Sequence, residues 1–185
     1  IWAYKKDKTA GRIINIGSHP EGSTSGEKLQ ITEACFRYAI DGVGTPVLKG
    51  KLKPNEERYM NKHTSDNDPN YTRIGDLQYH HFSFEIAESN TNIRVELQGE
   101  ERIDFSIYLK KGVPAFNSNA DHAATGPGNN KTIKRQLTPG KWFVGVECKT
   151  TVKAELDGCR GFFNYSGKLS VLNGAAYKIK LVTNR

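Results

Sequence analysis

Tyr79-His80-His81-Phe82-Ser83-Phe84-Glu85-Ile86 is the stretch that decides the fold of this chain. Its apolar and polar side chains alternate from Phe82 to Ile86. Successive side chains of a strand point to opposite faces, so this pattern predicts a half-buried β-strand. The neighbours His80 and His81 then point to opposite faces of that strand, which disfavours a zinc site made by both together.

The same alternation recurs along the rest of the chain. Residues 92–98 and 104–110 carry apolar side chains at every odd position. Further strands, separated by turns rich in Gly, Asn and Pro, are expected at 47–53, 132–137, 141–148, 167–172 and 176–182. Many short strands of period two are typical of an antiparallel β-sandwich. The sequence therefore predicts a mainly β chain whose second domain, residues 46–185, is such a sandwich.

Residues 1–45 have a different pattern and are expected to form a separate α/β segment of two strands and one helix. The strands are expected at 1–4 and 12–16, and the near-continuous apolar pattern of the second suggests burial on both of its faces. A helix is expected from about Gly26 to Ile40, with a Ser or Thr of residues 23–25 as its cap. Residues 41–46 end the helix and form a linker.

The charge and hydropathy of the chain limit its partners. The net charge is +7, but the Lys and Arg residues are scattered among acidic ones. Without an Arg-rich helix or an aromatic RNA-binding motif, this pattern favours solvated loops and strand edges over a nucleic-acid site. No apolar run approaches the roughly 18 residues of a membrane span. Because the chain begins at Ile1, we expect that a leader was removed or that it was cut from a precursor.

The three cysteines leave two interpretations open. Cys148 and Cys159 flank ten residues in the β-rich region and could close a hairpin loop by a disulfide. Alternatively all three thiols are reduced, with Cys35 buried on the predicted helix.

A polar loop is the one candidate cofactor site. Asp66 and Asp68, on either side of Asn67, offer the oxygen ligands that calcium prefers. A complete calcium-loop spacing is missing, so the alternative is a solvated loop. No other cofactor is predicted.

The order of the strands carries a family resemblance. The motifs are an aromatic opening strand, a second strand, a strand containing Asp104, a Pro-Gly turn with an aromatic strand, and a closing hairpin (79–86, 92–97, 103–109, 137–146 and 166–179). Over about residues 47–185, this order resembles the bacterial pre-peptidase C-terminal domain. The resemblance implies a jelly-roll-like, non-catalytic module that assists secretion, solubility or substrate contact in secreted hydrolases.

The chain departs from that family by an insertion at 149–164. Phe162, Phe163 and Tyr165 lie in or beside the insertion and are candidate binding residues. Trp142 and Phe143 lie in a predicted strand and are expected to be core residues.

A second resemblance concerns residues 1–45. Gly11 to Ile16, then His19-Pro20-Glu21, then a helix resemble the end of a class I glutamine amidotransferase-like domain. The resemblance implies that His19 is the general base for a cysteine nucleophile and that Glu21 orients the imidazole. That nucleophile is not in this chain, because Cys35 lies on the trailing helix. The alternative is a turn without a catalytic role.

Two functions follow from these observations. In the first, the chain is the C-terminal part of a secreted or periplasmic multidomain protein, and its sandwich is an accessory module attached to an amidotransferase-like hydrolase domain. Its partner is then the upstream part of the same precursor. In the second, the chain is a free-standing extracellular module without catalytic activity that binds carbohydrate or protein. In either case the chain alone is not expected to be catalytic.

Overall fold

The computed structural model of the chain describes residues 2–5, 12–15, 35, 46–64, 66–156 and 163–183. The chain divides into two compact units, residues 1–45 and 46–185. In the first unit, β1 (Trp2–Lys5) pairs antiparallel with β2 (Arg12–Asn15), and Cys35 is helical.

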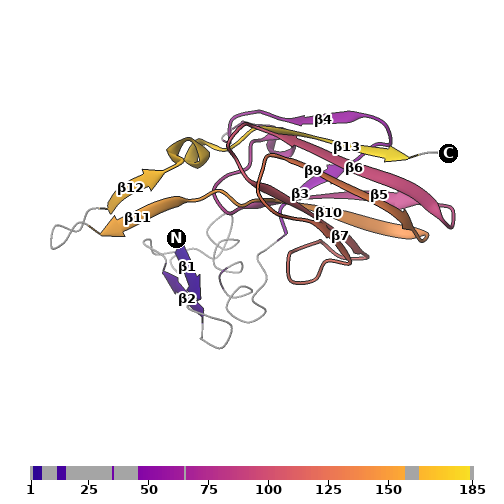
Figure 1. The fold of residues 1–185 in the computed structure, drawn as a ribbon, viewed down its shortest axis with the longest axis horizontal. Helices are drawn as coiled ribbons and strands as arrows, with labels where there is room; N and C mark the ends of the chain where they lie inside the picture. Colours follow the sequence, from indigo (N-terminus) through magenta and orange to yellow (C-terminus); the bar gives the residue numbers. More distant parts are fainter. Residues whose placement is uncertain are drawn as a thin grey trace. The chain divides into compact units, whose positions relative to one another are not determined.

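The second unit is built on two sheets, as the sequence predicts (Figure 1). The first sheet has five strands in the order β3-β5-β10-β7-β8. They are β3 (Leu48–Lys51), β5 (Tyr79–Ile86), β10 (Gly140–Cys148), β7 (Phe105–Lys111) and β8 (His122–Ala124). All neighbours are antiparallel except β3, which runs parallel to β5.

The second sheet has four antiparallel strands in the order β4-β13-β6-β9. They are β4 (Glu57–Met60), β13 (Tyr177–Thr183), β6 (Thr91–Gly99) and β9 (Asn130–Leu137). Figure 1 shows this sheet layered against the five-stranded one.

The apolar half of each alternating strand forms one core between the two sheets. Phe82 and Phe84 of β5 are 0% and 2% exposed, and Val95 of β6 is 0% exposed. The core also contains a polar contact, because His80 Nδ1 lies 2.8 Å from the hydroxyl of Tyr177 on the opposite sheet. Trp142 belongs to this core, as expected. Phe143 is also buried, at 7% exposure, under the Lys141 ammonium 5.1 Å from its ring.

Arg58 links β4 to β3, the edge strand of the five-stranded sheet, by hydrogen bonds. Its guanidinium donates to the carbonyl oxygens of Lys49 and Lys51 on β3, and to that of Asn70 at 2.8 Å. It also lies 4.5 Å from the centre of the Tyr71 ring. Backbone carbonyl oxygens therefore accept the hydrogen bonds of the Arg58 guanidinium, and this cation needs no carboxylate partner.

A loop after β7 covers the outer face of the five-stranded sheet. His81 Nε2 donates to the carbonyl oxygen of Ala115 at 3.0 Å, and its Nδ1 accepts from the Val47 amide at 3.2 Å. The Phe116 ring lies 4.5 Å from the His81 ring. His80 and His81 thus point to opposite faces of β5, as predicted, and both are buried.

The predicted insertion forms a two-stranded sheet of its own. β11 (Val152–Leu156) pairs antiparallel with β12 (Phe163–Gly167), and the two extend beyond the sandwich in Figure 1. The strand predicted at 167–172 is wrong, because the chain forms a 3-10 helix at Leu169–Asn173 instead. Gly167 and Gly174, with φ of 90° and 84°, turn the backbone away from the extended conformation on either side of it.

Candidate binding face

The outer surface of the four-stranded sheet is the candidate site. On β6, Ile93, Val95 and Leu97 are buried in the core, so the residues between them project outward. The same alternation holds on the other three strands. We call the projecting set the polar face: Glu57, Tyr59, Asn92, Arg94, Glu96, Gln98, Asn130, Thr132, Lys134, Gln136, Lys178, Lys180 and Val182.

The strand register aligns these side chains in rows across the sheet. One row is Tyr59, Lys178, Gln98 and Asn130. The next row is Glu57, Lys180, Glu96 and Thr132. Residues directly opposite on neighbouring strands lie about 5 Å apart, so each row is a continuous line of hydrogen-bonding groups.

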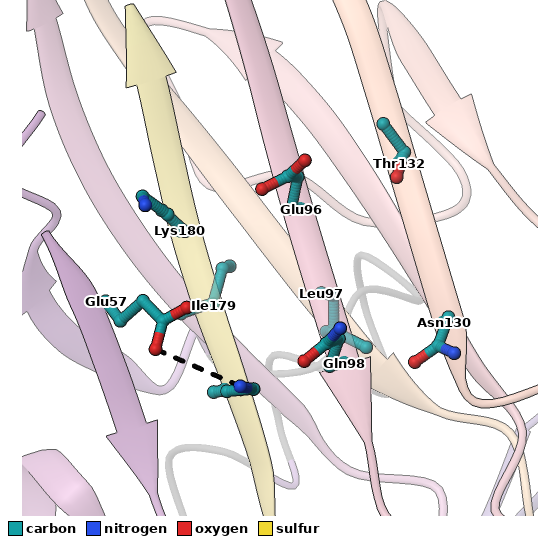
Figure 2. Close-up of a pocket in the computed structure, with 9 residues that line it drawn as sticks. Glu57, Glu96, Leu97, Gln98, Asn130, Thr132, Ile179 and Lys180 are labelled. Atoms are coloured by element: carbon teal, nitrogen blue, oxygen red, sulfur yellow. Dashed lines mark ion pairs between the residues drawn. The ribbon is translucent and has the colours of Figure 1, made fainter. Parts of the chain in front are cut away.

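A depression of about 310 Å³ lies over these two rows. Figure 2 shows Glu96, Gln98, Asn130 and Thr132 around it, on β6 and β9. Glu57 and Lys180 project from β4 and β13 on the other side. The depression therefore presents amide, hydroxyl, carboxylate and ammonium groups together, a mixture suited to a ligand with many hydroxyl groups.

Ion pairs and hydrogen bonds hold the two carboxylates of the polar face. Glu57 accepts from the Tyr59 hydroxyl at 2.7 Å and lies 3.9 Å from the Lys178 ammonium. The Tyr59 hydrogen bond and then Lys178 lower the pKa of Glu57. Glu96 lies 2.7 Å from Arg94 Nε. Each carboxylate therefore has a cation of the polar face beside it.

A second depression, of about 450 Å³, continues the polar face toward the other end of the sheet. Arg94 and Lys134 stand directly opposite each other there, flanked by Asn92 and Gln136. This end of the face is cationic.

The sequence placed the binding residues elsewhere. Tyr165 lies on β12 and is 55% exposed, and the backbone of Phe163 belongs to the same strand. Phe162 lies outside the described residues. A binding role for these three residues therefore stays a prediction.

The carboxylates of the predicted calcium loop are held by a side chain. The Lys62 ammonium lies 3.5 Å from Asp66 and 3.5 Å from Asp68. The Asp68 amide donates to Asp66 at 2.8 Å and is the main cause that lowers the pKa of Asp66. Among the residues that the structure describes, no cluster of three or more His, Cys, Asp or Glu side chains is suited to a metal ion.

We expect calcium to leave the thermal unfolding midpoint of the chain unchanged, because the Lys62 ammonium lies 3.5 Å from both carboxylates and offsets half of their charge. Lys62→Met removes that cation and leaves two like charges, so this variant should gain stability from calcium at roughly millimolar concentration. Thermal unfolding with calcium and with a chelator measures both effects. Calcium stabilisation of the natural chain would instead support the calcium interpretation of the sequence.

The remaining predicted site residues lie in or next to undescribed parts. Cys148 ends β10 as a buried free thiol whose pKa burial raises to about 11. Cys159 lies outside the described residues, so the disulfide considered from the sequence stays a prediction. His19 and Glu21 also lie outside them, so their catalytic role stays a prediction.

Within the described residues, no helix is both long and apolar enough to cross a membrane.

Together these features define a β-sandwich module with one polar sheet face. Residues 78–147 match the family model of the bacterial pre-peptidase C-terminal domain. The matched residues include β5, β6, β7, β9 and most of β10, and the order of these strands is the one on which the resemblance rests. No curated protein matches the chain.

The solved structures that are similar to this chain include the following two. One is the pre-peptidase C-terminal domain of a collagenase from Bacillus anthracis, at 14% identity and a TM-score of 0.42, over 74% of this chain and 94% of that one. The other is PliG from Aeromonas hydrophila, a periplasmic inhibitor of g-type lysozyme, at 9% identity and a TM-score of 0.43. That alignment covers 76% of this chain and all of PliG.

Proposed function

We propose that the sandwich is a non-catalytic binding module that holds an attached hydrolytic domain on an extracellular polysaccharide. The polar face carries this proposal. Its rows of amide, hydroxyl and carboxylate groups match the alternating donors and acceptors of sugar hydroxyls, and Tyr59, at 52% exposure, offers an aromatic surface at the edge.

The setting of the module is part of the same proposal. A secreted or periplasmic location is supported by the match to a bacterial pre-peptidase C-terminal domain. The attached domain would be the amidotransferase-like one that residues 1–45 resemble, with His19 and Glu21 in its active site.

Retention of the full chain on insoluble polysaccharides tests this function. We expect Gln98→Ala combined with Asn130→Ala to weaken retention about tenfold, because two hydrogen bonds of the polar face are lost. Asn61→Ala combined with Asn173→Ala removes two exposed amides elsewhere and should leave retention unchanged. Equal retention of both double variants would show that the polar face is not the binding surface.

A protein ligand is the second candidate, and the exposed Tyr165 on the protruding β11–β12 sheet favours it. In that case Tyr165→Ala would abolish capture of the protein ligand, whereas the polar-face variants would not affect it.

A further inference from the structure

We propose that the polysaccharide bound by the polar face is acidic, and that Lys134 and Lys180 contact its carboxylate or sulfate groups. This inference rests on the proposed function and adds the chemical class of the polymer. It is carried by the placement of charge on the sheet.

The polar face has more cations than carboxylates to pair with them. Glu57 is paired with Lys178, and Glu96 with Arg94. Among the described residues, neither Lys134 nor Lys180 forms an ion pair, although Lys180 stands between Glu57 and Glu96 in its row and its charge contributes to lowering the pKa of Glu57. Two ammonium groups of the face are therefore available to an anionic ligand.

The pairing of two cations at one end of the polar face does not stabilise the fold. Arg94 and Lys134 are direct cross-strand partners, and the neighbour of Arg94 on its other side is Val182. Like charges directly opposite on a sheet destabilise it. They also line the 450 Å³ depression, so an anion bound there would relieve this repulsion.

The spacing of the two available lysines suits a chain-like ligand. Lys180 lies on β13 and Lys134 on β9, with β6 between them. They are thus two strand spacings apart, roughly 10 Å across the sheet. Asn92, Gln98 and Thr132 project from the strands around them and can bond hydroxyl groups between the charges.

The carboxylates of the face argue against nucleic acid as the ligand. Glu57 and Glu96 stand among the cations and would repel a continuous row of phosphates. They can accept hydrogen bonds from sugar hydroxyls, so a sparsely charged polysaccharide fits this face better.

The test compares binding of the full chain to polygalacturonate, to uncharged dextran and to single-stranded DNA, at low and high salt. We expect polygalacturonate to bind most tightly, and Lys134→Gln combined with Lys180→Gln to weaken its binding about threefold to tenfold. The matched control is Lys51→Gln combined with Lys141→Gln, which removes two charges from the five-stranded sheet and should change nothing.

Three results would overturn the inference. If both polysaccharides bind equally and the double variant changes neither, the polar face binds polysaccharide without selecting charge, and only the proposed function stands. If neither polysaccharide binds, the proposed function fails as well. If DNA binds more tightly than polygalacturonate and loses binding in the double variant, the cations contact phosphates.

Discussion

Lowering the pH from 7 to 4.5 is expected to remove most of the stability of the sandwich. His80 and His81 are the cause, because both are buried as neutral imidazoles. Burial, followed by the charges of Lys49 and His81, lowers the pKa of His80 to about 3. Burial lowers the pKa of His81 to about 4, although its hydrogen bond to the Ala115 carbonyl raises it.

The direction of this effect follows from proton binding. In the unfolded chain both histidines have a pKa near 6.5, so below that pH the unfolded state binds more protons than the folded state. Above about pH 6.5 the two histidines therefore do not reduce the free energy of unfolding. Below that pH, each histidine lowers the free energy of unfolding by roughly 1.4 kcal/mol per pH unit, until its pKa in the folded chain is reached. At pH 4.5 the loss is about 5 kcal/mol, which is comparable to the whole stability of a small domain.

Urea unfolding at a series of pH values measures this loss, and the imidazole NMR signals of the folded chain show whether both histidines stay neutral down to the pH at which the chain unfolds. The onset near pH 6.5 is diagnostic, since carboxylates titrate at lower pH. His122→Asn changes a partly exposed histidine and should leave the profile unchanged. Constant stability between pH 7 and 4.5 would contradict the assignment of buried neutral histidines.

The sandwich could be predicted from sequence because its signal is local. The odd positions from Ile93 to Leu97 are apolar, and burial of one face of a strand fixes that pattern whatever the strand pairs with. The strand predicted at 167–172 failed for an equally local reason. Its apolar residues Leu169, Val171 and Leu172 lie between two glycines of positive φ, and only Val171 is buried.

In the sequence, the residues of the polar face are visible only as the polar positions that alternate with the apolar ones. Arg94 and Glu96 occupy even positions between the apolar residues of 92–98, so the pattern places them on the exposed side of a strand, but their neighbours depend on register. Lys134 is opposite Arg94 although 40 positions separate them, and no local pattern contains that pairing. Sequence reasoning therefore favoured aromatic residues of the insertion, which stand out individually.

The loop over the five-stranded sheet was also beyond sequence analysis, and it leads to the second large effect. Gly145→Ala is expected to expel this loop and lower the free energy of unfolding by about 2–4 kcal/mol. A Cβ at Gly145 would lie 2.0 Å from the carbonyl oxygen of Ala115. Gly145 has no positive φ, so alanine suits the strand itself and only the loop obstructs it.

Expulsion of the loop would have consequences beyond stability. His81 would lose its acceptor at Ala115 and its contact with the Phe116 ring. Because burial is the main cause of the low pKa of His81, that pKa should rise toward 6.5 in the variant, and the pH dependence should weaken. Trypsin should also cleave the native variant faster after Lys111, the last residue of β7, where the loop begins.

Phe116→Ala provides the comparison, because it weakens the same loop without adding a Cβ to the sheet. If both changes act by releasing the loop, their effects on the free energy of unfolding should be clearly less than additive in the double variant. Full additivity, or a Gly145→Ala chain with unchanged stability and an unchanged His81 pKa, would show that the loop does not depend on the glycine. Agreement of unfolding, NMR and proteolysis would establish that Gly145 is required for the loop to bury His81.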